Sequence, residues 1–327
     1  MRNVARPDDA FGGASDRDEF PASPTYFERP LLKAPHWEWN IVTYLFLGGI
    51  MGGLGLIAAL CDSRDVGDRR LRRIVRFASL ALAAANPAIL ISHLGRPERF
   101  LNMLRIVKVK SPMSLGVWGL VLYSTAATAT AVRELAEMRA LPPQFRCVAP
   151  EALNGAQALL GAFLAGYTGV LLSATANPFW ASGKRHIPAA CVASGAAGAC
   201  ALAGLLCEIT GNHRVRGKLE ALEMVSGAAE LLILTDFSRR AGAYAAPMFS
   251  GTCGRRLRIY TTIGGTLVPI ALNTLGRAFA LPKNVDAIRT IAASLLTLVG
   301  GYVFRLSLID AGKASAGNPR AASRQPK

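Results

Sequence analysis

Eight apolar stretches separated by charged loops constrain the fold of this 327-residue chain more than any other feature. Three parts of them, residues 41–61, 152–176 and 187–207, contain no Asp, Glu, Lys or Arg. About 20 apolar residues span a bilayer as a helix, and in lipid only helices and closed barrels satisfy every backbone polar group. The stretches lack strand-like alternation and are rich in Ala, Leu and Gly, which favours helices. The sequence therefore predicts an all-α integral membrane protein.

The chain divides into a membrane domain and two tails. We expect a polar tail at 1–35, a membrane domain at 36–312 and a disordered basic tail at 313–327. The first tail lacks the apolar core and cleavage site of a signal peptide. Eight transmembrane helices are expected at about 39–61, 74–95, 114–133, 152–175, 187–207, 220–237, 258–278 and 288–309.

The net charge of +16 could indicate a nucleic-acid partner. However, Lys and Arg fall almost wholly between the apolar stretches, where they meet lipid headgroups, so the bilayer and not nucleic acid is the expected partner. Eight spans place both termini on one side, here called side A, together with the loops 95–113, 176–186 and 238–257. Side A carries more Lys and Arg than the opposite side B. The positive-inside rule then predicts a multi-pass protein of the inner, cytoplasmic membrane with cytoplasmic termini.

Cysteines and histidines give no sign of a bound metal or haem. None of the six cysteines forms a C-x-x-C pair, so an iron–sulfur or zinc site within this chain is not expected. A haem in a bundle needs axial ligands on facing helices, whereas His36, His93 and His186 lie at side-A helix ends and His213 lies in a side-B loop. We therefore expect no haem or metal in this chain.

Three acidic residues, Glu220, Glu223 and Glu230, share one stripe of the sixth predicted helix. Ionisable groups at membrane depth are costly and are candidates for function. One interpretation is ion pairing with a buried arginine, for which Arg305 in the eighth helix is the obvious partner. The other is a route for protons through Glu223 and Glu230.

A second group of polar and aromatic residues converges on side A. A quinone head group needs hydrogen-bond donors for its two carbonyls, an aromatic shelf and a proton donor at the membrane edge, and these residue types fit. An ordinary interfacial belt of Trp, Tyr, Lys and Arg has the same composition. The group contains His36, Trp37, Glu38, Trp39 and Asn40 at the start of the first span, His93 and Arg96 at the end of the second, Tyr167 in the fourth, and Asn177, Lys184, Arg185 and His186 around the loop into the fifth, with Trp39 a candidate for the aromatic shelf and His93 for the proton donor.

The order of short motifs resembles that of the NrfD / polysulfide reductase membrane-subunit family. The most specific motif is Leu94-Gly95-Arg96-Pro97 with its continuation Ser111-Pro112-Met113-Ser114. The others lie in family order between residues 37 and 312: Trp39 with Tyr44-Leu45-Phe46-Leu47-Gly48-Gly49, Thr175-Ala176-Asn177-Pro178-Phe179-Trp180, Gly300-Gly301-Tyr302-Val303-Phe304-Arg305 and Asp310-Ala311-Gly312.

This resemblance implies a fold of two four-helix bundles in the membrane. It also implies a function as the quinone-interacting subunit of a respiratory oxidoreductase complex, with menaquinone or ubiquinone as the electron carrier. Electrons would pass to or from a ferredoxin-like iron–sulfur subunit, and through it a catalytic subunit, often a molybdopterin enzyme. The main catalytic centre would lie in that partner.

The resemblance places the quinone pocket at the start of the first span. By position, the pocket would use His36, Asn40, Tyr167 and Arg185. Many members carry an acid directly before the Leu-Gly-Arg-Pro motif, whereas this chain has His93, whose ordinary pKa near 6.5 still suits proton transfer. The basic loops 95–113 and 238–257 would dock the partner, with contacts expected from Arg96, Arg99, Lys108 and Lys110.

Two alternatives stay open at this point. Pro87 and Pro269 could break the second and seventh helices, as in a proton or solute transporter, although no paired inverted repeat is visible. The chain could also be an inert anchor for an enzyme. Neither the substrate of the partner nor the direction of electron flow follows from the sequence.

Overall fold

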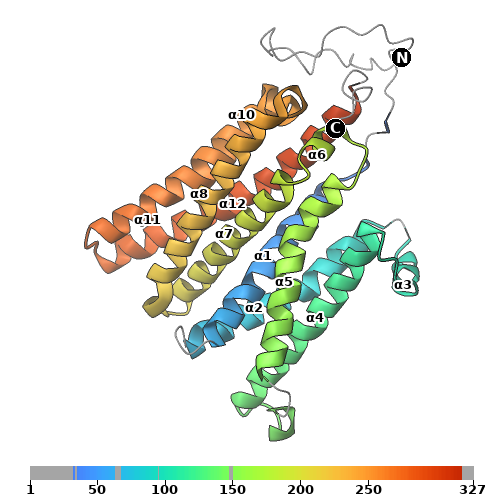
Figure 1. Ribbon diagram of the computed structural model, residues 1–327. Coiled ribbons are helices and arrows are strands. Elements are labelled where there is room, and N and C mark those ends of the chain that lie inside the picture. Colours follow the sequence, from blue (N-terminus) through green and yellow to red (C-terminus); the bar gives the residue numbers. More distant parts are fainter. Residues whose placement is uncertain (1–31, 34, 63–67, 95, 147–149, 319–327) are drawn as a thin grey trace, which may run out of the picture.

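The computed structural model describes residues 32–33, 35–62, 68–94, 96–146 and 150–318, and this part of the chain is helical without a β-strand. Long helices run side by side, with short helices at their ends (Figure 1). The predicted tail at 1–35 lies almost wholly outside the described residues, and α12 continues to Ala316, past the predicted domain boundary at 312. The elements are α1 Trp39–Asp62, α2 Arg69–Ser92, α3 Arg99–Leu104, α4 Pro112–Glu137, η2 Pro143–Arg146, α5 Pro150–Ser173, α6 Pro178–Ser182, α7 His186–Ile209, η3 His213–Val215, α8 Arg216–Ala241, η4 Gly242–Tyr244, α9 Ala246–Phe249, α10 Gly251–Arg256, η5 Leu257–Leu267, α11 Val268–Ala278 and α12 Lys283–Ala316.

Among the described residues, six helices are long and apolar enough to cross a membrane: α1, α2, α4, α5, α7 and α12. The sequence predicted eight. The sixth predicted span corresponds to α8, which has the length but carries many charged residues. The seventh corresponds to an unbroken helical stretch at 251–278 that changes from α to π geometry and back, so that α10, η5 and α11 are each shorter than a span.

Local sequence signals begin several of these helices. Asp68 is the N-cap of α2, and its carboxylate accepts from the Leu71 N–H at 2.8 Å. Ser111 caps α4, with Pro112 in the first turn, where a missing N–H costs nothing. The Ser-Pro-Met-Ser motif is therefore a helix start that positions α4 at the membrane edge.

Glycines of α1 bring three helices close together. The backbones of Gly52 and Gly161 touch, so that a Cβ on Gly161 would lie 2.6 Å from the Gly52 carbonyl oxygen of α1. On the other side of α1, a Cβ on Gly195 of α7 would lie 2.8 Å from the Gly49 carbonyl oxygen. Small residues spaced four apart along a helix, such as Gly48 and Gly52 or Gly49 and Gly53, permit close packing of this kind. α1 thus packs against α2 and α5 as well as against α7 and α12.

The segment 175–182 is fastened to the end of α12. The Asn177 side-chain amide donates to the Gly312 carbonyl at 2.7 Å, and the Trp180 indole N–H donates to the Leu308 carbonyl at 3.0 Å. Trp180 also stacks on Trp37, with ring centroids 5.2 Å apart. Two of the family-like motifs therefore serve to dock α6 and the start of the membrane domain onto α12.

Candidate functional site

Two polar side chains of α1 line the side-A end of the fold. Asn40 and Tyr44 are one helical turn apart and therefore lie on one face of α1. Both are buried, with exposed fractions of 9% and 8%. The buried carbonyl oxygen of the Asn40 amide has no hydrogen-bond partner among the described residues. Buried polar groups are normally satisfied, so this position calls for a ligand or water.

Tyr167 of α5 completes this group. Its ring packs over Gly116 of α4, where no side chain could fit, and lies close to Tyr44. Its hydroxyl donates to the Pro112 carbonyl at 2.8 Å. The group of Asn40, Tyr44 and Tyr167 is here called the side-A pocket, after the quinone pocket that the sequence predicts at this end of the fold. Tyr44 was not among the site residues predicted from the sequence. Its spacing of four residues from Asn40 places the two side chains on one helix face and would have indicated it.

The other predicted quinone residues lie at the surface. Trp39 is 66% exposed, and His36 and Arg185 are exposed. Arg185 occupies the N-cap position of α7 without a side-chain capping bond. His93, at the C-cap of α2, is half-buried. The structure therefore buries Asn40 and Tyr167 and leaves the remaining candidates exposed or half-buried.

The predicted docking residues belong to an exposed segment beside α3. Arg96, Lys108 and Lys110 are exposed, while the side chain of Arg99 lies outside the described part. Between them stand the exposed apolar residues Leu101, Ile106, Val107 and Val109. The surface at 108–111 forms an open depression of about 410 Å³ directly before Pro112. Cations and apolar side chains thus share one surface next to the side-A pocket.

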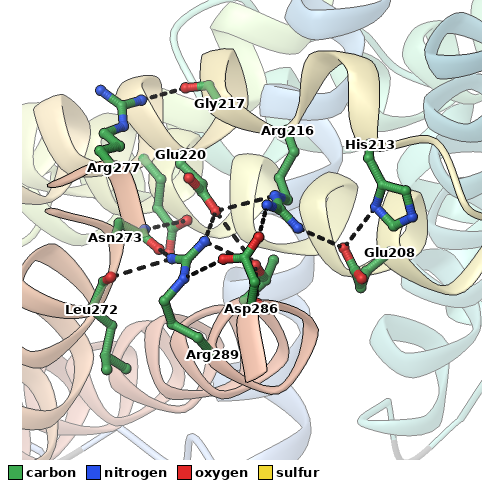
Figure 2. Close-up of polar contacts among 12 residues, drawn as sticks. Glu208, His213, Arg216, Gly217, Glu220, Leu272, Asn273, Arg277, Asp286 and Arg289 are labelled. Atoms are coloured by element: carbon green, nitrogen blue, oxygen red, sulfur yellow. Dashed lines mark hydrogen bonds and ion pairs between the residues drawn. The ribbon is translucent and has the colours of Figure 1, made fainter. Parts of the chain in front are cut away.

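The acidic stripe of α8 begins in a buried cluster at side B (Figure 2). Glu220 accepts from Arg289 of α12 at 2.7 Å, and Arg289 also donates to Asp286 at 2.9 Å. Arg216 contacts both Asp286 and Glu208. Glu220 is therefore held by a network of ion pairs. Ion pairing was one of the two interpretations of the acidic stripe, but the arginine that pairs with Glu220 is Arg289 and not the expected Arg305.

Deeper along the stripe the acids are not ion-paired. Glu223 accepts from Thr297 at 2.6 Å and from Asn273 at 3.4 Å. One oxygen of Glu230 has no partner, and Arg305 donates only to the Cys191 carbonyl, at 2.9 Å. The predicted direct pair between Glu230 and Arg305 is wrong: the two groups lie within Coulombic range but make no ion pair. The reason is that the guanidinium of Arg305 turns toward α1 and the α7 backbone.

A further polar network was missed in the sequence. Glu134 of α4 is fully buried and contacts Arg72, Arg73 and Arg76 of α2 at 2.7–3.0 Å. The predicted helix limits, 74 and 133, left most of these residues in loops. The sequence did contain a signal for this network. Asp68 can cap a helix, and the arginines that follow it are spaced so that several lie on one face of that helix.

From Arg76 the network continues toward the centre of the fold. Arg76 donates to Asn154 at 2.7 Å. Further along, Gln157 donates to Ser79 at 3.2 Å, and the Tyr123 hydroxyl lies 2.7 Å from Ser79 and donates to the Met51 carbonyl at 2.5 Å. These bonds tie α1, α2, α4 and α5 together through buried polar groups.

No group of three or more His, Cys, Asp or Glu in the described part is arranged to hold a metal ion. The side-A pocket offers instead an amide and phenol groups at a membrane edge, which suits a neutral ligand with hydrogen-bonding carbonyls. The long apolar helices of the described part place the chain in the class of integral membrane proteins.

Comparison with known families agrees with this class. Residues 31–316 match the family described as "Polysulphide reductase, NrfD", and the chain therefore belongs to the NrfD family. Its members are membrane subunits of respiratory oxidoreductase complexes, which typically contain iron–sulfur and catalytic subunits. No curated protein matches the chain.

Proposed function

We propose that this chain is the quinone-interacting membrane subunit of such a complex and passes electrons between the membrane quinone pool and an iron–sulfur partner. The observation that carries the proposal is the unpartnered amide oxygen of the buried Asn40, one helical turn from Tyr44, which in turn lies close to Tyr167. A quinone supplies two carbonyl acceptors and, when reduced, two hydroxyl donors. The Asn40 amide can form hydrogen bonds with either form, because its NH₂ group can donate to a quinone carbonyl and its oxygen can accept from a quinol hydroxyl.

The pocket residues would bind and orient the ring. Tyr44 is free of hydrogen bonds among the described residues and can donate one, while the Tyr167 ring forms a wall over Gly116. The exposed residues His36, Trp39 and Arg185 would form the mouth of this pocket. There the Trp39 ring and the Arg185 cation could bind a quinone head group as it enters from the lipid. A quinone bound there supplies the electron-carrying group, so this chain needs no redox centre of its own.

Partner docking is proposed for the exposed basic surface on side A. Arg96, Arg99, Lys108 and Lys110 would contact the iron–sulfur subunit, which places its cluster next to the side-A pocket. The proton donors proposed from the sequence are His93 at the pocket and Glu223 and Glu230 in the α8 stripe. Menaquinone and ubiquinone share the carbonyl pattern on which this binding depends.

For the membrane topology, we propose eight crossings in two four-helix bundles. α1, α2, α4 and α5 would form the first bundle, and α7, α8, the stretch 251–278 and α12 the second. The ion pairs of Glu220 with Arg289 support a crossing by α8, because pairing lowers the cost of charges in lipid. The unbroken helical stretch at 251–278 is long enough to cross despite its change of register.

The test is to isolate the complex and titrate it with quinone analogues. Quinone-dependent electron transfer together with a co-purifying ferredoxin-like subunit is expected. An assembled complex that is indifferent to quinone would identify an inert anchor. A chain that purifies without redox partners and moves a solute or protons would identify a transporter.

A further inference from the structure

A small cavity lies inside the fold between α7, α8, η5, α11 and α12. Its volume of about 10 Å³ is near the least that one water molecule needs. The side chains on its walls carry oxygen atoms from all of these elements. They include Ser194, Thr261, Thr266, Asn273 and Thr297.

Two carboxyl groups reach this cavity from α8. Glu223 and Glu230 are two turns apart on the same face and are 6% and 5% exposed. Glu223 is held by Thr297 and Asn273, whereas one oxygen of Glu230 has no partner. A buried carboxyl oxygen left without a partner in an oxygen-lined cavity indicates that something else binds there.

The π-helical segment η5 forms one wall of the cavity through Thr261, Gly265 and Thr266. At its end the Val268 N–H bonds to the Ile263 carbonyl, five residues back. The next residue, Pro269, also lines the cavity and has no N–H to donate, so the backbone hydrogen bonds of the helix are interrupted beside the cavity.

The charges around the cavity do not balance. At the side-B end, Glu220 and Asp286 are matched by Arg289 and Arg216. Deeper in, the described residues bring one further guanidinium, that of Arg305, near Glu230, while Arg289 of the side-B cluster also acts on Glu223. The described cavity walls from α7, η5 and α11 carry no charged side chain. One negative charge is left over inside the bundle, where an uncompensated charge is costly.

We propose that this cavity binds one exchangeable monovalent cation, either as a proton on Glu223 or Glu230 or as Na⁺ among the surrounding oxygens. A proton and Na⁺ each carry one positive charge, so either one neutralises the surplus carboxylate. A proton is taken from water by a carboxylate, which becomes a carboxylic acid. The inference deepens the proton role proposed above for Glu223 and Glu230 and rests on it, but it does not require quinone to bind at the side-A pocket, because the cavity does not include that pocket.

The experiment uses the full chain in lipid nanodiscs at constant ionic strength. Infrared spectra report the C=O stretch of a protonated carboxyl group, and thermal unfolding is compared in Na⁺ and in N-methylglucamine. The variants are Glu223→Gln, Glu230→Gln and the double variant. Asp236→Asn is the matched control, because Asp236 lies on the same helix but is half-exposed and outside the cavity.

If the cation is a proton, the wild type shows a protonated carboxyl band at neutral pH that Na⁺ does not change. That band is lost in Glu223→Gln or Glu230→Gln and kept in Asp236→Asn. If the cation is Na⁺, the unfolding midpoint of the wild type and the control rises with Na⁺, as expected for a ligand of the folded state, and the Glu variants lose this rise.

A wild type that shows neither signal would overturn the proposal without any variant. So would a double variant that keeps the wild-type response. Loss of quinone-linked activity alone does not bear on this result, so failure of the cation site and failure of the quinone function remain distinguishable.

Discussion

The Tyr167 hydroxyl donates its one proton to the Pro112 backbone carbonyl, 2.8 Å away. A phenol has a single donor hydrogen, so Tyr167 cannot give it to a quinone carbonyl while this bond persists. Tyr44, for which the described residues show no hydrogen bond, is therefore the stronger candidate for a donor to a quinone carbonyl, whereas the unpartnered amide oxygen of Asn40 can accept from a quinol hydroxyl. Tyr167 instead links α5 to the start of α4 and shapes the pocket wall.

We expect Asn40→Ala and Tyr44→Phe to slow quinone-linked electron transfer roughly tenfold to a hundredfold, because a lost hydrogen bond in a buried site is worth about 1.5–3 kcal/mol. Tyr167→Phe should slow it less. The measurement is quinol-dependent turnover of the purified complex, alongside dye-linked activity of the catalytic subunit, which should not change.

Ser92→Ala, an exposed change at the C-terminal end of α2, is the control for this series and should behave as wild type. His36→Ala and Arg185→Ala test the exposed mouth and are also expected to lower the quinone-dependent rate. Wild-type rates in all four pocket and mouth variants, Asn40→Ala, Tyr44→Phe, His36→Ala and Arg185→Ala, would place the quinone elsewhere.

The ion pair between Glu220 and Arg289 should be strongly coupled. Removing one partner breaks a buried ion pair, although Arg289 keeps its contact with Asp286 and Glu220 stays 3.7 Å from Arg216, so Glu220→Ala and Arg289→Ala should each lower the free energy of unfolding by about 1–3 kcal/mol. The double variant should recover part of this loss. Thermal unfolding of all three variants in nanodiscs gives the coupling energy, and strictly additive losses would argue against the pair.

The exposed pair of Asp236 and Arg240 provides the comparison for that cycle. Its charged groups are four residues apart on α8 and 2.8 Å from each other, but both reach solvent. Exposed ion pairs contribute little to stability. Arg240→Ala should therefore leave the unfolding temperature almost unchanged.

Gly312 and Gly155 should respond in opposite ways to alanine. A Cβ on Gly312 would overlap the Trp180 indole, so Gly312→Ala should destabilise the fold by about 1–3 kcal/mol. A Cβ on Gly155 of α5 meets nothing within 4 Å, and Gly155→Ala should stabilise by about 0.5–1 kcal/mol. Unfolding midpoints that do not separate the two variants would contradict the packing of α6 on α12.

Eight crossings predict the sides of the loops. In a cysteine-free background, single cysteines at residues 36, 250 and 313 should react with an impermeant reagent from one face of the membrane. Cysteines at 212 and 281 should react from the other. Labelling of 212 and 250 from the same face would show that α8 does not cross.

The sequence by itself determined the membrane location, the helical class and the family. Uninterrupted apolar runs can satisfy their backbone in lipid only as helices, and this follows from composition without knowledge of any contact. Capping residues such as Asp68 and Ser111 likewise mark helix starts through local hydrogen bonds. The glycines spaced four apart in α1 indicate close helix packing, because only glycine has no side chain to hold two helix backbones apart.

Only the tertiary structure decided which charged groups meet. Arg289 and Arg305 lie on the same long helix, and the choice between them as partner for the α8 stripe depends on the relative height and rotation of α8 and α12. The same holds for Glu134 with Arg76, and for Tyr167, whose hydroxyl goes to Pro112. Partners of this kind are distant in sequence and are set by helix packing, which spacing within one helix does not reveal.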